Sequence, residues 1–259
     1  MNSHEIDYKI FGEEMQFVEI ELDPYETVIA ESGSFMMMDD GMELSTLFGD
    51  GSHEEANKGL WGKVLSAGKR LLTGESLFMT AFTHAGPGKK RVSFAAPYPG
   101  QIVPMDLAAL DGRIICQKDA FLCAAKGVSI GIEFSRKIGR GLFGGEGFIM
   151  QKLEGDGHAF LHAGGAIIEK ELQIGEVLRI DTGCLVAFTR EVDYDIEMIK
   201  GVRNMVFGGE GLFYALKALG NRLQFLHAFD VSFQRLAPRT RARGTAGVGG
   251  GNQQGVRKI

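Results

Sequence analysis

The chain has 259 residues and a mass of 28.2 kDa, and 44% of its residues are hydrophobic, so it can bury a core in one large or two small domains. A net charge of -5 argues against a globally basic nucleic-acid-binding protein, so we expect no specific nucleic-acid partner. Three cysteines without a CxxC spacing exclude a disulfide framework and fit the reducing cytoplasm. Glycine, at 37 of 259 residues, is about twice as frequent as the ordinary share of roughly 7%, which indicates many tight turns.

The two ends of the chain differ from the rest. Residues 1–7 carry acids where a secretory signal peptide has basic and apolar residues, and no apolar run approaches the roughly 18 residues of a membrane span. We therefore expect a cytoplasmic protein. Residues 237–259 hold basic side chains, no acid and a glycine-rich stretch, which predicts a disordered basic tail.

The elements between these ends are predicted to be strands, arranged as three similar units at about 13–98, 99–163 and 164–229. Each unit has an acid–leucine pair before an apolar run, then a glycine–glutamate step, then a segment like Phe-Leu-His-Ala. The acid–leucine pairs are Glu21-Leu22, Asp106-Leu107 and Glu171-Leu172. The closing segments are Ser93–Ala96, Phe160–Ala163 and Phe225–Ala228.

Three similar β units predict an all-β fold around a pseudo-threefold axis, in which the strands at Val28, Ile114 and Val177 are equivalent. Glycine-rich turns at 86–88 and 155–157 are expected to close β-hairpins. Strands 6–11 and 231–236 have no counterpart in the units. We expect them to pair and close a single domain spanning 1–236, because an unpaired edge invites aggregation.

The first unit is longer because it contains an insertion with helical periodicity. Apolar side chains at Leu60, Val64 and Leu71 fit one face of a short helix near 55–72, and basic residues accompany them. Such a helix either caps the end of a β barrel or lies on a membrane surface.

The quoted motifs resemble the family related to yeast Altered Inheritance of Mitochondria protein twenty-four. The resemblance covers roughly residues 5–236 and rests on the Gly-Gly-Glu-Gly units at 144–147 and 208–211, on Glu31–Met36 and on the Phe-Leu-His-Ala segments. It implies a β-rich fold similar to the tryptophan RNA-binding attenuation protein (TRAP), of the double-stranded β-helix type. It implies no established enzymatic activity and no catalytic residues, and the fold alone does not bring tryptophan or RNA binding with it.

Basic side chains precede each glycine–glutamate step and form the candidate basic surface. If the units surround one axis, these side chains lie at the same end of the molecule and can attract an anionic membrane surface despite the net charge. The alternative is that they pair with the glutamates of the steps. The basic residues are Lys63, Lys69, Arg70, Arg136, Lys137, Arg140, Lys200 and Arg203, and the glutamates are Glu75, Glu146 and Glu210.

Two further sequence patterns could indicate ligand sites, one for a metal and one for a dinucleotide. His162 and His227 are predicted to be repeat-equivalent, but a metal site needs three or four converging ligands, so packed histidines are the expectation. The glycines at 139–144 match a dinucleotide-binding pattern without the required helix after them, which favours a glycine bulge. We therefore expect no metal and no cofactor.

Three functional hypotheses follow. The first is a non-enzymatic β scaffold or binding protein that acts as a homo-oligomer, with a trimer as one candidate stoichiometry. The second is a peripheral membrane protein that uses the basic end. The third is an enzyme or small-ligand-binding protein with a site between units, for which an apolar pocket with converging polar groups would be the evidence.

Overall fold

The computed structural model describes residues 3–48, 78–133, 150–198, 212–219 and 225–229, the last of these by the backbone. Within these ranges every regular element is a β-strand except a single 3-10 turn, η2 (Lys118–Ala120), so the predicted all-β fold is confirmed. Among the same residues, no helix is long and apolar enough to cross a bilayer.

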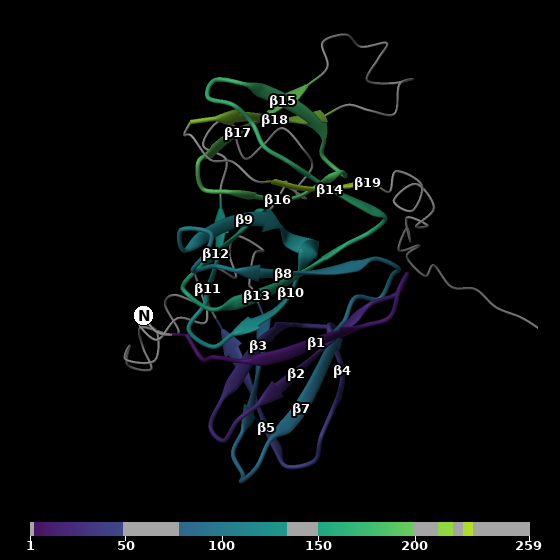
Figure 1. Ribbon diagram of the computed structural model, residues 1–259, viewed down its shortest axis with the longest axis vertical. Helices are drawn as coiled ribbons and strands as arrows, with labels where there is room; N and C mark the ends of the chain where they lie inside the picture. Colours follow the sequence, from purple (N-terminus) through teal and green to yellow (C-terminus); the bar gives the residue numbers. More distant parts are fainter. Residues whose placement is uncertain (1–2, 49–77, 134–149, 199–211, 220–224, 230–259) are drawn as a thin grey trace, which may run out of the picture.

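The strands pair antiparallel throughout, in four sheets (Figure 1). In chain order they are β1 (Asp7–Phe11), β2 (Phe17–Leu22), β3 (Thr27–Glu31), β4 (Phe35–Met38), β5 (Met42–Phe48), β6 (Phe78–His84), β7 (Lys90–Ala95), β8 (Gln101–Asp106), β9 (Arg113–Gln117), β10 (Phe121–Ala125), β11 (Ser129–Glu133), β12 (Met150–Glu154), β13 (His158–Ala163), β14 (Ala166–Lys170), β15 (Val177–Asp181), β16 (Leu185–Thr189), β17 (Val192–Met198), β18 (Leu212–Ala218) and β19 (Phe225–Phe229).

After β1, the strands form three consecutive sets, β2–β7, β8–β13 and β14–β19, which pair in the same order. In each set the first strand pairs with the sixth, and the sixth also pairs with the third. The fourth strand pairs with the fifth, and the fifth also pairs with the second. The strands that begin near Val28, Ile114 and Val177 are therefore the second strands of the three sets.

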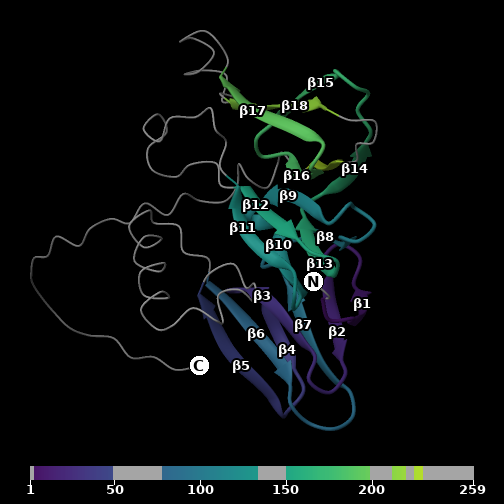
Figure 2. The same ribbon diagram turned by 90° about the vertical axis from the view of Figure 1, so that its left-hand side faces the viewer.

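Two ladders join the sets to one another. The second strand of the first set, β3, pairs with the third strand of the second set, β10, and in the same way β9 pairs with β16. The resulting six-stranded sheets have the orders β5-β6-β3-β10-β13-β8 and β11-β12-β9-β16-β19-β14. Figures 1 and 2 show the three sets following one another along the long axis, from the purple strands through teal to green.

The expected hairpins at the two glycine-rich turns are wrong. Strands β6 and β7 flank residues 86–88 but join different sheets, as do β12 and β13 on either side of residues 155–157. Glycines specify a chain reversal and do not specify which sheet the next strand joins. Buried His84 organises the first of these turns, with its Nε2 2.9 Å from the carbonyl oxygen of Gly88 and its Nδ1 accepting the N–H of Gly86 at 3.3 Å.

Other expectations about the ends and the symmetry have mixed outcomes. The terminal strand β1 pairs with β2, whereas residues 231–236, the expected partner, lie outside the described residues, as do the helix near 55–72 and the tail 237–259. The pseudo-threefold axis stays a prediction, because no ladder among the described strands joins β4 of the first set to β15 of the third.

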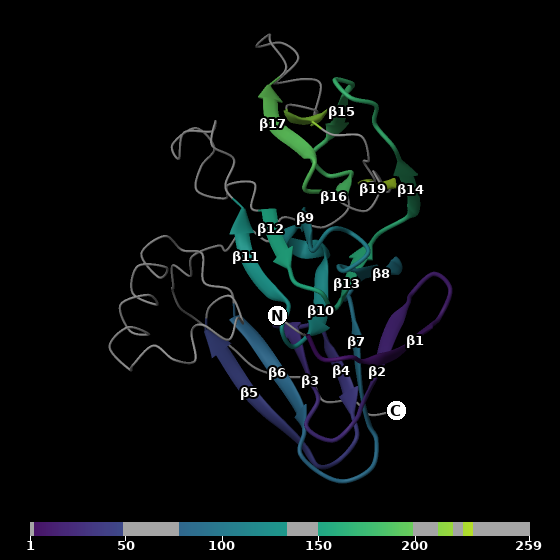
Figure 3. The ribbon, with the colours of Figure 1, turned by 60° about the vertical axis from the view of Figure 1, so that its left-hand side comes forward.

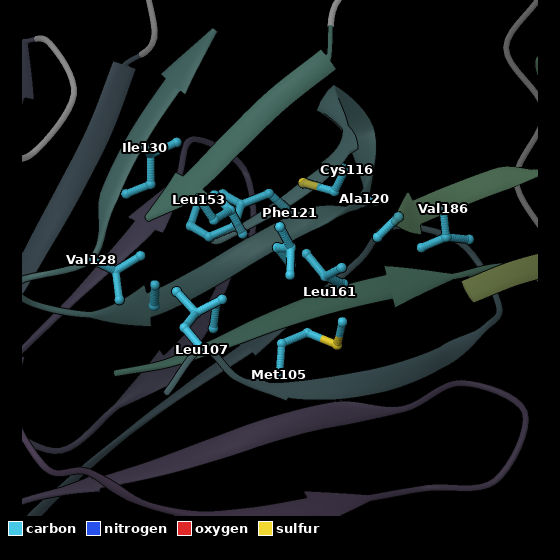
Figure 4. Packing of buried hydrophobic residues seen from close by; sticks show 14 of the residues in the cluster. Met105, Leu107, Cys116, Ala120, Phe121, Val128, Ile130, Leu153, Leu161 and Val186 are labelled. Atoms are coloured by element: carbon cyan, nitrogen blue, oxygen red, sulfur yellow. The ribbon is translucent and has the colours of Figure 1, made fainter. Parts of the chain in front are cut away.

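The core consists of three clusters of buried apolar side chains. The leucines of the acid–leucine pairs, Leu22, Leu107 and Leu172, are each at most 1% exposed, so this sequence landmark marks a buried position in all three sets. Figure 4 shows Leu107, Phe121 and Leu161 among the side chains of the central cluster. Strands β10 and β13, which carry Phe121 and Leu161, are apolar in sequence because both of their faces are covered.

Candidate functional site

The sequence-predicted charged residues lie in three segments outside the described part of the chain, 49–77, 134–149 and 199–211. These segments hold all eight members of the candidate basic surface and the three glutamates of the glycine–glutamate steps. Whether the basic side chains gather at one end of the molecule therefore stays a prediction.

The strands that flank these segments are nevertheless placed. Each segment connects the fourth and fifth strands of its set, and the last ladder pairs before the three connections are Phe48 with Phe78, Glu133 with Met150 and Met198 with Leu212. The connections are thus attached at equivalent points of the three sets. In Figure 3 the ends of β5, β11 and β17 point toward the same side of the molecule.

The two histidines predicted to be equivalent differ by one residue in strand register. His162 pairs with Ile102, which lies five residues before Leu107, whereas His227 pairs with Ile168, which lies four residues before its counterpart leucine at 172. A shift of one residue in a strand reverses the face of the sheet that a side chain occupies. The sequence similarity of the closing segments therefore overstated the correspondence between the histidines.

His162 is the member of that pair whose side chain the structure describes, and it is 2% exposed on β13. The ring of Tyr98 packs edge-on against it with the ring centroids 4.7 Å apart, and neither ring nitrogen of His162 has a hydrogen-bond partner. Burial lowers the pKa of His162, so the imidazole is neutral at physiological pH. His162 is thus a packed histidine, as expected, and it is packed without a hydrogen bond to either ring nitrogen.

A carboxyl group with a perturbed pKa lies near Tyr98, the residue that packs against this histidine, at the junction of the first two sets. Glu31 ends β3, and burial together with repulsion from Asp119 raises its pKa to about 7, while Lys118 opposes the shift. The hydroxyl of Tyr98 donates a 3.2 Å hydrogen bond to the carbonyl oxygen of Asp119, and burial, Asp119 and Glu31 raise the tyrosine pKa. We call Glu31, Tyr98, Asp119 and His162 the junction cluster.

The junction cluster contains groups that titrate near neutrality, but it lacks the geometry of acid–base or nucleophilic catalysis. Such catalysis needs a base held by hydrogen bonds within reach of its partner, and His162 makes none. Nor does any group of three or more His, Cys, Asp or Glu side chains in the described ranges have the arrangement of a metal site. The cluster is therefore best described as a polar junction in which His162 is buried, Glu31 is half-buried, and Tyr98 and Asp119 reach the surface.

The most unusual surface is strand β4, which we call the β4 patch, Phe35–Met38. Its four side chains are exposed at 44%, 49%, 45% and 38% in chain order. The equivalent third strands of the other two sets, β10 and β16, are buried at every position. Among the described strands, β4 pairs only with β7, and none pairs with its other edge.

The local contacts fix β4 in this exposed position. The hydroxyl of Ser34 donates to the carbonyl oxygen of Glu31 at 2.8 Å and lies 3.2 Å from the carbonyl oxygen of Leu122 on β10. The ring of Phe35 stacks on Phe82 with centroids 5.3 Å apart. Beyond the strand, the carboxylate of Asp39 accepts the backbone N–H of Arg91 at 2.9 Å.

Sequence reasoning missed the β4 patch and the junction cluster. The available signal for the patch was the unbroken run Phe35–Met38, since four successive apolar residues in a short strand indicate burial on both faces. No sequence signal identifies Glu31 and Tyr98 as neighbours, because they lie far apart in the chain.

Comparisons with known proteins agree with this fold. The family model described as "Mitochondrial biogenesis AIM24" matches residues 8–221. An uncharacterized protein of Streptococcus pyogenes serotype M6 is 34% identical over 211 residues, which cover 80% of each chain. The crystal structure of a Streptococcus pyogenes protein superposes with a TM-score of 0.68 at 23% identity, covering 89% of this chain and 96% of that one. The chain described here therefore belongs to the AIM24 mitochondrial biogenesis family.

Proposed function

We propose that this protein is a non-enzymatic β scaffold that acts through homo-oligomeric assembly in the cytoplasm, and that the β4 patch is a surface through which it assembles. The single observation that carries the proposal is the contrast between β4 and its counterparts. The same strand position is buried in the second and third sets and exposes four apolar side chains in the first.

The energetic argument is that exposed apolar area on an unpaired edge favours association. Burial of apolar surface contributes about 25 cal/mol per Å², and an open strand edge adds unpaired N–H and C=O groups. Contiguous apolar patches on a protein surface mark interaction sites or aggregation hazards. A short edge strand flanked by the acidic residues Asp39 and Asp40 fits a specific site better than general aggregation.

The proposal is tested by the native mass of the full chain and of a charged variant. Light scattering after gel filtration should give a multiple of 28.2 kDa for the wild type. Met37→Lys should reduce the mass to that of one chain, because a desolvated lysine opposes the interface. Met15→Lys is the matched control, since Met15 is 59% exposed and lies outside β4.

A monomeric wild type at micromolar concentration would contradict the proposal. An oligomer whose mass responds equally to both substitutions would remove β4 from the interface. Thermal unfolding of both variants checks that a change in mass does not come from loss of the fold.

A second candidate function is attachment to an anionic membrane through the candidate basic surface. The observation in its favour is that the three basic segments leave the β-sheets at equivalent points, after β5, β11 and β17. Clustered basic residues are attracted to anionic lipid by about 1 kcal/mol each near the surface.

Flotation with phosphatidylserine vesicles at low salt tests this second function. A variant with Lys69, Arg70, Arg140 and Arg203 changed to Gln should float less than the wild type. Equal flotation of the two proteins, or none by the wild type, would rule the membrane function out. Flotation that Met37→Lys abolishes and the Gln variant retains would assign lipid binding to the β4 patch instead.

A further inference from the structure

We propose that β15 of one copy pairs antiparallel with β4 of a second copy. This contact would repeat, between chains, the pairing of a second strand with a third strand that joins β3 to β10 and β9 to β16 within the chain. This inference rests on the proposed assembly and names the surface that the β4 patch meets. The occupant is a second copy of the same chain, bound head to tail.

The strand orders of the four sheets carry the inference. The two six-stranded sheets follow one pattern, in which fourth, fifth and second strands of one set are followed by third, sixth and first strands of the next. The three-stranded sheet β15-β18-β17 is the first half of that pattern, and β4-β7-β2, with β1 added, is the second half. Joining β15 to β4 produces the order β17-β18-β15-β4-β7-β2, which is the same six-stranded sheet.

The two half-sheets cannot complete each other within one chain. Strand β15 lies at one end of the long axis and β4 toward the other in both Figures 1 and 2. No ladder among the described strands connects them. A neighbouring molecule can supply the half that each of these sheets lacks among the described strands.

The two existing junctions also predict the register of the third. In the first, Cys123 of β10 faces Ala30 of β3; in the second, Ala187 of β16 faces Cys116 of β9. Each third strand has a bulge two residues long that ends at this junction residue, and in β4 the bulge runs from Phe35 to Met37. Met37 is therefore the counterpart of Cys123 and Ala187.

The counterpart positions on β15 follow from turn hydrogen bonds. The N–H of Tyr25 donates to the carbonyl oxygen of His84 before β3, and the N–H of Gly175 donates to Ala218 in the same way before β15. Thr27 and Val177 are thus equivalent first residues, and Ile180 is the counterpart of Ala30. The predicted ladder places Met37 opposite Ile180, Met38 opposite Arg179 and Asp39 opposite Leu178.

The exposed side chains on β15 match this assignment. Its sheet edge carries Val177 at 44% exposure, and Ile174 in the preceding turn is 64% exposed. The central positions of the paired second strands β3 and β9 are buried, whereas the corresponding stretch of β15 alternates between exposed and covered. Both edges thus show apolar area that the two internal junctions cover.

A polar contact at the second junction predicts a corresponding polar contact at the proposed β15–β4 junction. The amide of Gln117, at the end of β9, donates to the carbonyl oxygen of Thr182 in the turn before β16. Glu31 ends β3 at the first junction, and Asp181 is the equivalent residue of β15. We expect Asp181 to face the turn Ser32–Gly33 of the neighbouring copy.

The proposed contact is heterologous, because different strands of the two copies meet. Head-to-tail contacts give a ring when the rotation between copies closes and an open chain when it does not. In a ring, every β4 pairs with a β15 of a neighbouring copy. In an open assembly, one β4 and one β15 stay unpaired, at its two ends.

Disulfide trapping with variants that each add one surface cysteine tests the pairing. Directly opposed residues in an antiparallel ladder have Cα atoms within reach of a disulfide, whose usual Cα separation is roughly 5.5 Å. A mixture of Met38→Cys and Arg179→Cys chains should form a disulfide-linked heterodimer on oxidation. A chain that carries both substitutions should form disulfide-linked oligomers of more than two chains. The native cysteines, Cys116, Cys123 and Cys184, are buried and at most 6% exposed.

One control mixture and a second opposed pair make the register testable. Val177→Cys mixed with Met38→Cys moves the thiol two residues along β15 and should cross-link at least tenfold less. Because Arg179 also forms a 2.7 Å ion pair with Glu197, a second opposed pair, Asp39→Cys with Leu178→Cys, repeats the test without that residue.

The outcomes separate this inference from the function on which it rests. Heterodimer formation by both opposed pairs supports the inference. An oligomeric wild type in which neither opposed pair cross-links, or in which Met38→Cys alone forms homodimers, overturns the β4–β15 contact and leaves assembly standing. A monomeric wild type overturns both.

Discussion

Tyr98 and His162 pack edge-to-face with their ring centroids 4.7 Å apart, and this contact replaces the hydrogen bonds that a buried histidine ordinarily makes. The arrangement leaves two ring nitrogens without partners inside the junction between the first two sets. An unsatisfied buried polar group costs about 1 to 3 kcal/mol. The junction is therefore held by the surrounding apolar packing and ladders, and its polar groups respond to pH.

The first prediction concerns the protonation of His162. Because burial lowers its folded-state pKa below the ordinary value of 6.5, the folded state is stabilised above pH 6.5 and loses this contribution as the pH falls through the lowered pKa. His162→Phe keeps a ring against Tyr98 and removes the titration. Urea unfolding at pH 7.5 and 5.5 should show a smaller loss of stability in the variant, and an equal loss would contradict the assignment.

The second prediction concerns Glu31 and has the opposite sign. Its folded-state pKa of about 7 lies above the ordinary 4.5, so its contribution to stability is present at low pH and is lost as the pH rises from about 4.5 to about 7. Glu31→Gln should therefore gain stability over the wild type between pH 5 and pH 8, by at most about 3 kcal/mol.

Two features of the chain make the Glu31 experiment interpretable. Glutamine occupies the equivalent position in the second set, Gln117, so the substitution has a structural precedent in this fold. Glu5→Gln removes an exposed carboxyl elsewhere and serves as the control. A pH profile of Glu31→Gln parallel to that of the wild type would show that Glu31 is not the titrating group.

The third prediction concerns Gly100, which lies directly against the junction cluster. A Cβ atom at this position would collide with the carbonyl oxygen of Ala163 and with Nε2 of His162. The backbone cannot retreat easily, because Gly100 donates to Glu14 at 2.7 Å and accepts from Gln16 at 3.2 Å.

We expect Gly100→Ala to lower the free energy of unfolding by about 2 kcal/mol, as overpacking of a filled site does. Gly131→Ala is the matched control, since the nearest atom to its added Cβ is the side-chain Cε of Lys152 at an ordinary 3.5 Å. Equal unfolding midpoints for the two variants would refute the steric argument.

The fourth prediction concerns Ser34, which links β3 to β10 across the first junction. Its hydroxyl is 2.8 Å from the carbonyl oxygen of Glu31 and 3.2 Å from that of Leu122. Ser34→Ala should cost about 1 kcal/mol in urea unfolding, the usual net value of one hydrogen bond. The same position in the second set is Ala120, so the smaller side chain fits the turn, and a larger loss would indicate a role beyond this bond.

Sequence reasoning predicted the parts of this fold that depend on local pattern. The acid–leucine landmark found Leu22, Leu107 and Leu172, because the leucine at or just after the end of the first strand of each set is buried in every copy. Pairing partners were harder: the turn at 86–88 was predicted to close a hairpin, yet β6 and β7 join different sheets. Glycine and proline determine local backbone angles, whereas sheet membership depends on contacts distant in sequence.

The candidate site could be predicted less well. Charge clusters are visible in a sequence, and they led to the basic segments, which lie outside the described residues. Exposure of an apolar strand is not visible in the sequence, because Phe35–Met38 and Phe121–Ala125 are both apolar runs, yet the first is exposed and the second is buried at every position. The raised pKa of Glu31 likewise depends on its burial and on the nearby Asp119, and both of these come from the fold.

The bulge in each third strand explains why these strands carry no alternation of polar and apolar residues. An extra residue in one strand of a ladder inverts the inside–outside phase of everything after it, so positions before and after the bulge follow opposite parities. Phe121–Ala125 and Leu185–Thr189 carry such a phase change, are paired on both edges and are buried throughout, so neither face of these strands is reserved for polar residues. Removing a single residue from either bulge would restore one parity along the strand and reverse the facing of its remaining side chains.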